Sequence, residues 1–210
     1  MIRVKICGVV RPDDIAASVA AGADYVGFNF IAGSPRFLSF DAAAALAGAS
    51  PAASKRIGLV LDAADDLISK AVATGRLAGL QLHGSETPER VAAVKRLTGI
   101  EVWKAVGVRT RADVLAARAF AGVADRILFD AKTDAALPGG MGVRFDWRLL
   151  AGIDPGAPWG LAGGLDASTV ADAIAIAQPP LVDVASGVED APGVKSPAKI
   201  RAFIEAVRSA

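Results

Sequence analysis

The segment Arg56-Ile57-Gly58-Leu59-Val60-Leu61 is a nearly continuous apolar run. Such runs are typical of parallel β-strands that are buried on both faces. A segment of helical length follows at 64–74, and this alternation recurs along the whole chain. It predicts strands at 4–7, 25–30, 56–61, 79–83, 101–106, 126–130, 159–162 and 182–186, with helices near 12–21, 41–48, 64–74, 87–97, 111–121, 144–150, 168–177 and 197–208.

Eight strand–helix units in series indicate an α/β protein with a parallel sheet. We expect residues 1–210 to form one domain, a single eight-stranded parallel (β/α)₈ TIM barrel, for which about 200 residues is the lower end of the size range. An open doubly wound sheet is the alternative. That fold usually carries a G-x-G-x-x-G turn after its first strand, whereas this chain has Cys7-Gly8-Val9-Val10-Arg11.

The composition narrows the class of function. With 23 Lys and Arg against 22 Asp and Glu, the chain has no excess of positive charge for a nucleic acid partner. No apolar run reaches the roughly 18 residues of a membrane span, and residues 1–5 do not have the pattern that would predict a signal peptide. A single cysteine cannot form an internal disulfide, and a single histidine argues against a metal site. We therefore expect a cytoplasmic protein without a metal.

Polar residues and glycines stand at the ends of the predicted strands, where the active site of a barrel forms. Cys7, His83, Asp130 and Ser186 end the first, fourth, sixth and eighth strands. Gly163-Gly164 follows the seventh strand, and Ser186-Gly187 follows the eighth. Either loop alone could be an ordinary turn, but together they stand where barrels commonly bind phosphate through backbone N–H groups. A small phosphorylated substrate is therefore favoured.

Cys7 and Asp130 are the candidate base and acid. A free cysteine is often a small buried hydrophobic residue, and Asp130 could equally be a helix cap or a loop acid. At strand ends beside a phosphate site, however, a thiol with an ordinary pKa of ~8.5 can act as a base and a carboxyl group as a proton donor. The two residues would lie across the barrel mouth from each other.

Three further site candidates each have two interpretations. Arg36 follows a Ser-Pro turn and could bind a substrate carboxylate through two parallel hydrogen bonds, or pair with Asp41 at the surface. His83 could contact the substrate or have a structural role. Asp183 lies on the last predicted strand, which becomes a neighbour of the first when the barrel closes. It could form a buried ion pair with Lys5, or face the substrate.

A series of short motifs occurs in a specific order and spacing. They are Lys5-Ile6-Cys7-Gly8, Gly22-Ala23-Asp24, Ser34-Pro35-Arg36, Gln81-Leu82-His83-Gly84, Phe129-Asp130, Gly139-Gly140-x-Gly142, Phe145-Asp146-Trp147, Leu161-Ala162-Gly163-Gly164-Leu165 and Ser186-Gly187-Val188-Glu189. Each is weak alone. Together they resemble, almost from end to end, the phosphoribosylanthranilate isomerase family of tryptophan biosynthesis.

The resemblance implies an Amadori rearrangement of an aminoaldose, N-(5'-phosphoribosyl)anthranilate, to the ketose 1-(2-carboxyphenylamino)-1-deoxyribulose 5-phosphate. It implies that Asp130 protonates the ring oxygen, that the Cys7 thiolate removes the C2 proton and that Arg36 holds the anthranilate carboxylate. The loops at 163–164 and 186–187 would hold the phosphate. No cofactor is implied, because the substrate nitrogen is the electron sink.

Three positions depart from the family's pattern: Met141 replaces a common Thr, Ala185 replaces a serine and Ser196 replaces an Asp. The first two changes affect side-chain contacts of the predicted loops, but the acid and base candidates are retained.

Other phosphate-binding barrels fit less well. A metal-dependent pentose-phosphate epimerase would need more histidines, and indole-glycerol-phosphate synthase or the tryptophan synthase α chain would use carboxylate or lysine chemistry. A barrel that only binds or regulates is the alternative outside the enzymes, and the intact Cys7 and Asp130 pair argues against it. Whether the protein is a monomer or a homodimer is left open by the sequence.

Overall fold

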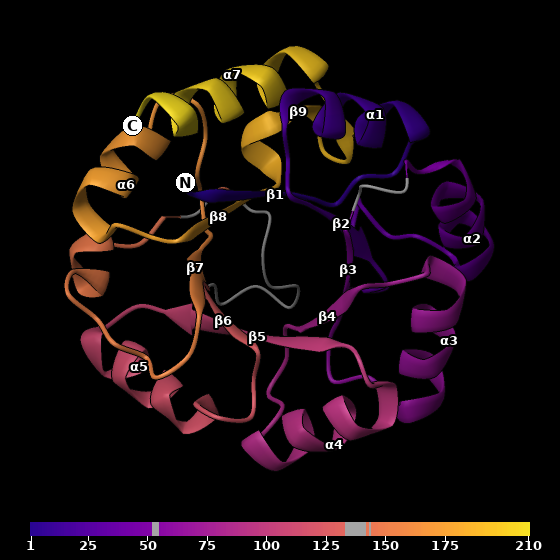
Figure 1. The fold of residues 1–210 in the computed structure, drawn as a ribbon, viewed down its shortest axis with the longest axis horizontal. Helices are drawn as coiled ribbons and strands as arrows, with labels where there is room; N and C mark the ends of the chain where they lie inside the picture. Colours follow the sequence, from indigo (N-terminus) through magenta and orange to yellow (C-terminus); the bar gives the residue numbers. More distant parts are fainter. Residues whose placement is uncertain (52–54, 133–141, 143) are drawn as a thin grey trace.

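The computed structural model describes residues 1–51, 55–132, 142 and 144–210. Eight parallel strands form a closed barrel in chain order (Figure 1), and β8 pairs with β1. Their bounds are β1 Arg3–Cys7, β2 Tyr25–Asn29, β3 Lys55–Val60, β4 Gly79–Leu82, β5 Glu101–Val108, β6 Arg126–Ala131, β7 Trp159–Leu161 and β8 Leu181–Val184. The predicted barrel is confirmed, with strand ends that differ by one or two residues, and the open sheet is excluded.

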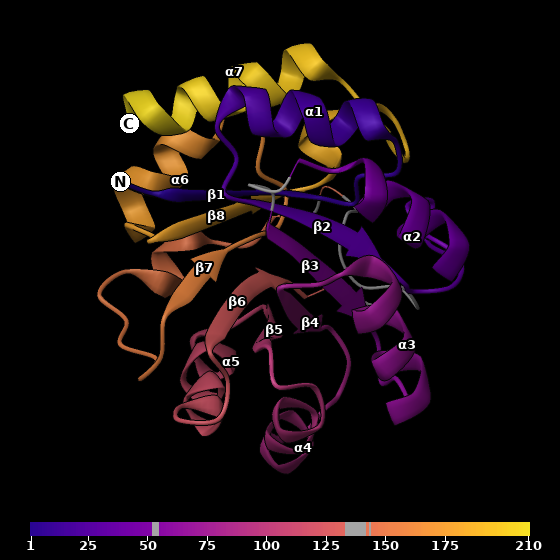
Figure 2. The same ribbon diagram turned by 45° about the vertical axis from the view of Figure 1, so that its right-hand side comes forward.

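Helices surround the barrel, and the last helix lies alongside the first in both ribbon views (Figures 1 and 2). Within the described residues, no helix is long and apolar enough to cross a membrane. The α-helices are α1 Pro12–Ala21, α2 Phe40–Ala49, α3 Asp65–Gly75, α4 Pro88–Thr98, α5 Arg111–Ala116, α6 Val170–Ala177 and α7 Pro197–Ser209, and the 3₁₀ helices are η1 Ala117–Phe120, η2 Trp147–Leu150 and η3 Ser186–Val188.

Two predicted helices were wrong in extent. The helix expected near 144–150 is only η2, because the Asp146 side chain accepts a hydrogen bond from the backbone N–H of Arg148 and starts the helix at that point. At its other end, Ala151 is already extended, and Gly152 beyond it has a φ of 63°, so the helix does not continue. The helix expected near 111–121 divides into α5 and η1.

The end of the last strand was also predicted wrongly. β8 stops at Val184, and Ser186 begins η3 instead of ending the strand. Gly187 in η3 packs against the backbone carbonyl of Leu165, so closely that a Cβ atom could not fit between them. A short antiparallel sheet then follows that the sequence did not predict, formed by β9 Glu189–Ala191 and β10 Val194–Lys195.

The strands have an outer face that packs on the helices and an inner face that fills the barrel. Val4 and Ile6 of β1 belong to the core shared with the helices. Because side chains alternate along a strand, Lys5 and Cys7 point into the barrel. A separate inner cluster contains Tyr25, Ile57, Trp103, Leu128, Ala162 and Leu181. The inner face therefore carries both an apolar cluster and the buried polar residues described below.

Candidate active site

A cavity of about 500 Å³ lies at the carboxyl ends of the strands. Of the predicted site residues, the structure places at its wall Cys7, Arg36, His83, Asp130, Gly163, Gly164, Asp183 and Ser186. Gly187 does not line the cavity, because its Cα packs against Leu165. The cavity therefore brings together side chains that are far apart in the sequence.

Cys7 ends β1 and is buried, with 7% of its surface exposed. Its partner across the sheet is Gly27 on β2. A Cβ atom at Gly27 would lie 2.9 Å from the Cys7 Sγ atom, so this position has room for the thiol only because it is glycine. Burial raises the pKa of the Cys7 thiol, and the positive charge of Lys5 opposes that shift.

Lys5 and Asp183 form the buried ion pair that the sequence left as one of two possibilities. They are register partners on β1 and β8, and Lys5 Nζ lies 2.8 Å from Asp183 Oδ2. Lys5 Nζ also donates to Gln81 Oε1 on β4 at 2.9 Å. Asp183 lines the cavity as well, and its buried Oδ1 atom has no hydrogen-bond partner among the residues that the structure describes. The carboxylate therefore joins the ion pair through one oxygen only.

Asp130 lies near the end of β6, and its Oδ1 atom accepts a hydrogen bond from the backbone N–H of Ala131 at 2.8 Å. Its Oδ2 atom is 3.4 Å from His83 Nε2. Gly163, with φ of 90°, leaves space for this carboxylate, because a Cβ atom there would be 2.9 Å from Asp130 Oδ1. Thus His83, from the end of β4, and Gly163, after β7, both lie beside the candidate acid.

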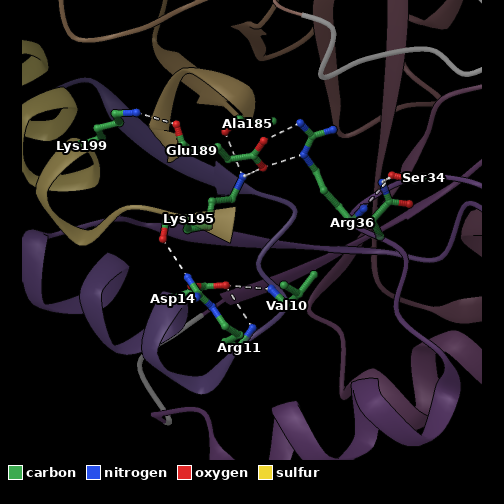
Figure 3. Close-up of polar contacts among 10 residues, drawn as sticks. Val10, Arg11, Asp14, Ser34, Arg36, Ala185, Glu189, Lys195 and Lys199 are labelled. Carbon is green, nitrogen blue, oxygen red and sulfur yellow. Dashed lines mark hydrogen bonds and ion pairs between the residues drawn. The ribbon is translucent and has the colours of Figure 1, made fainter. Parts of the chain in front are cut away.

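Arg36 is buried and pairs with Glu189, so the surface pair with Asp41 that the sequence allowed does not describe it. Its Nε and Nη2 atoms each donate to a different oxygen of Glu189, both at 2.7 Å (Figure 3). The aliphatic part of Arg36 packs over Gly8, whose φ of 73° and missing side chain allow this close approach. The Glu189 carboxylate therefore holds the Arg36 guanidinium at the wall of the cavity.

Glu189 and Lys195 are site residues that the sequence analysis missed. Lys195 Nζ donates to Glu189 Oε1 at 2.7 Å and to the Ala185 carbonyl at 2.9 Å. Burial favours the neutral form of Glu189, but the hydrogen bonds from Arg36 and Lys195 outweigh it and lower the pKa of this carboxyl. Only the motif at 186–189 hinted at Glu189, and no local pattern marked Lys195.

Hydrogen bonds also connect the backbone of β10 to the loop between β1 and α1, as Figure 3 shows. Arg11 Nη2 donates to the Lys195 carbonyl at 2.8 Å and to Asp14 Oδ1 at 2.7 Å. Asp14 in turn accepts from the backbone N–H of Val10 at 3.1 Å. The loop that follows Cys7 is therefore connected to the buried charges around Glu189.

The two predicted glycine loops lie against each other. Gly163 and Gly164 both have positive φ, 90° and 63°, and Gly187 packs on the carbonyl of Leu165. Arg144 Nε donates to the Gly164 carbonyl at 2.9 Å. Of the motif at 139–142, only Gly142 is among the described residues, and it lines the cavity. Met141 lies outside the described residues.

A closed parallel barrel with titratable side chains around a cavity at the carboxyl ends of its strands defines the class of (β/α)₈-barrel enzymes. The chain belongs to the N-(5'-phosphoribosyl)anthranilate (PRA) isomerase family, whose family model matches residues 4–206.

Individual relatives agree with this assignment. The N-(5'-phosphoribosyl)anthranilate isomerase of Azorhizobium caulinodans is 49% identical over 211 residues, which cover 100% of this chain and 92% of the relative. A crystal structure of monomers generated from the dimeric isomerase of Thermotoga maritima has a TM-score of 0.87 and 35% identity over 100% of both chains. A phosphoribosyl anthranilate isomerase in complex with reduced 1-(o-carboxyphenylamino)-1-deoxyribulose 5-phosphate has a TM-score of 0.88 and 33% identity, again over 100% of both chains.

Proposed function

We propose that the chain converts N-(5'-phosphoribosyl)anthranilate into 1-(2-carboxyphenylamino)-1-deoxy-D-ribulose 5-phosphate, in the biosynthesis of tryptophan, by general acid–base catalysis. The observation that carries the mechanism is the meeting of Cys7, Asp130 and Arg36 at the wall of one cavity. They provide a base, an acid and a cation from three different parts of the barrel. Family membership supports the substrate and the reaction.

In the proposed reaction, Asp130 donates a proton to the ring oxygen of the furanose. The C1–O bond breaks, and the lone pair of the substrate nitrogen forms a protonated C1=N bond. The Cys7 thiolate then removes the proton from C2, and the electrons of that C–H bond form C1=C2 and neutralise the nitrogen. The resulting enolamine takes up a proton at C1, its C2 hydroxyl loses a proton, and the ketose forms. Each proton transfer is of the kind for which a positioned side chain contributes ~10²–10⁴-fold.

Arg36 is proposed to bind the anthranilate carboxylate. Arg36 and Lys195 both bond to Glu189, and this arrangement fixes the Arg36 guanidinium at the cavity wall. A guanidinium held in this way is suited to bind a substrate carboxylate through hydrogen bonds.

We assign the phosphate to the backbone of Gly163 and Gly164, with the Ser186 hydroxyl beside them. Gly187 supports this loop from below the cavity wall. His83 and Asp183, which line the remaining wall, are proposed to contact the sugar. The Oδ1 atom of Asp183, which has no partner within the described part of the chain, is suited to accept a hydrogen bond from a sugar hydroxyl.

The proposal treats residues 1–210 as one catalytic domain whose partner is a small phosphorylated molecule, acting in the cytoplasm as a monomer or a homodimer. The isomerase of Thermotoga maritima is dimeric, and monomers have been generated from it, which supports both the monomer and the homodimer as proposals for this chain.

The purified protein can be tested on freshly prepared substrate, with the product identified by NMR from its C2 ketone and C1 methylene signals. Cys7→Ala serves as the matched control. We expect the ketose to form with the wild-type protein, and we expect the gene to rescue a tryptophan auxotroph that lacks this isomerase. A folded wild-type protein that leaves the substrate unchanged and does not rescue growth would refute the proposed function.

A further inference from the structure

Lys5 is a fully buried lysine in the inner face of the barrel, two residues before Cys7 on the same strand. A lysine in this position needs a reason, because burial of an ammonium group is costly unless it is paired. Asp183 and Gln81 bind Lys5 Nζ at 2.8 and 2.9 Å. Within the described part of the chain, these bonds use two of the three donors of the ammonium, which leaves one for a third acceptor.

The lone histidine is not placed to balance a thiolate at Cys7. His83 Nε2 lies 3.4 Å from Asp130 Oδ2, and its Nδ1 atom is 3.4 Å from Gln81 Nε2. The charges that act on Cys7 come instead from Lys5 on the same strand, Asp183 on β8, Lys195 on β10 and Arg36 in the loop after β2.

Of these cations, Lys5 is the one on the same strand as Cys7, and its partner is Asp183. Arg36 and Lys195 share Glu189, and both bond directly to it. Lys5 has the largest attractive effect on Cys7, ahead of Lys195, and it lowers the pKa of the thiol against the effect of burial. Conversely, the charges of Asp183 and Cys7 raise the pKa of Lys5 although burial opposes this, so the ammonium stays charged.

We propose that Lys5 is a positioning residue for the reaction: its buried ammonium, oriented by Asp183 and Gln81, is the counter-ion that stabilises the Cys7 thiolate. This inference rests on the proposed role of Cys7 as the base. It adds Lys5 as the group that stabilises the thiolate, because His83 is paired with Asp130 and Gln81 instead of the thiol. Asp183 then has two opposed effects, because it holds Lys5 in place and repels the thiolate.

The proposal is tested by titrating the thiol of the free protein, which needs no turnover. Cys7 is the only cysteine, so the thiolate absorbance and the rate of alkylation by iodoacetamide report on this residue alone, with Cys7→Ala as the blank. We expect Lys5→Met to move the midpoint of the titration upward by about 1 to 3 pH units, the range for loss of an adjacent opposite charge. Asp183→Asn is expected to move it downward.

The matched control is Lys104→Met on β5. Lys104 is also a buried lysine with a buried carboxylate partner, Glu86, at 3.0 Å, but it is not among the groups that chiefly shift the pKa of Cys7. We expect it to lower stability as Lys5→Met does and to leave the titration of the thiol unchanged. An equal shift in both variants would indicate a general loosening of the barrel and would overturn the proposal.

Lys5→Met leaves Asp183 unpaired and can prevent folding, so the double variant Lys5→Met/Asp183→Asn provides a second test without an isolated buried charge. Its midpoint is expected between those of the wild type and Lys5→Met, because the effect of Lys5 exceeds that of Asp183. A midpoint at or below the wild-type value would refute the role of Lys5. The role of Cys7 itself would still be judged separately, by the turnover of Cys7→Ala.

Discussion

Gly27→Ala is a one-carbon change that tests how the barrel positions its candidate base. A Cβ atom at this position would lie 2.9 Å from Cys7 Sγ and 3.0 Å from Cys7 Cα. Ordinary contacts between such atoms are about 3.5–4.0 Å, so the thiol and its backbone must move by roughly 0.6–1 Å. Because the closest contacts include backbone, rotation of one side chain cannot relieve them. We expect a loss of about 1–3 kcal/mol in the free energy of unfolding.

The same displacement should slow the reaction more than it lowers stability. A misplacement of about 1 Å can cost ~10²-fold in rate, so we expect kcat to fall by about 10- to 100-fold in protein that is still folded. The matched control is Gly48→Ala in α2, where the added carbon meets nothing within 4 Å apart from its chain neighbours and the nearby backbone of its own helix.

That control variant should gain about 0.5–1 kcal/mol in the free energy of unfolding, because Ala is favoured over Gly in a helix, with kcat unchanged. The measurements are steady-state kinetics and urea denaturation of both variants. If Gly27→Ala had the kcat and the stability of Gly48→Ala, the assignment of Gly27 as the space for the thiol would be wrong.

Three further predictions concern the charged groups. Arg36→Met should mainly raise KM, because it removes binding of the substrate carboxylate; a normal KM would place that carboxylate elsewhere. Glu189→Ala should lower the free energy of unfolding by about 3–5 kcal/mol, because it removes the carboxylate that Arg36 and Lys195 share in a buried site. Asp146→Ala breaks an exposed pair with Arg148 and removes the side-chain cap of η2, and it should lower the free energy of unfolding much less. Equal stabilities of the two variants would contradict this. Finally, kcat/KM of the wild type should rise with pH through the alkaline range. Burial raises the pKa of the Cys7 thiol, and only the thiolate is a base. If kcat/KM fell as the pH rose from neutral, the result would argue against a thiolate base.

The strands could be predicted from the sequence because each is buried on both faces and therefore reads as an apolar run. The residues at their ends follow from the same reasoning, since parallel strands bring their carboxyl ends to one side of the barrel. This places Cys7 and Asp130 correctly at one cavity. The pair of Lys5 and Asp183 was open to prediction for a related reason: closure makes β1 and β8 neighbours, and neither charge is stable there alone.

The partner of Arg36 could not be predicted in this way. Glu189 is 153 positions away in the sequence and lies in a two-stranded sheet too short to have a hydrophobic pattern. Where the end of a helix or strand depends on one tertiary contact, that end could not be predicted from the sequence either. Ser186 begins a 3₁₀ helix where the sequence suggested a strand, and the neighbouring Gly187 fits against the carbonyl of Leu165, a contact that no local preference encodes.

The central claim is that Cys7 is the base that removes the C2 proton. The most direct test is kcat of Cys7→Ala on freshly prepared N-(5'-phosphoribosyl)anthranilate, relative to the wild type, with circular dichroism to verify that both proteins are folded. Because a positioned base contributes ~10²–10⁴-fold, kcat of the variant should fall by at least ~10²-fold. A folded Cys7→Ala protein with the kcat of the wild type would contradict the account.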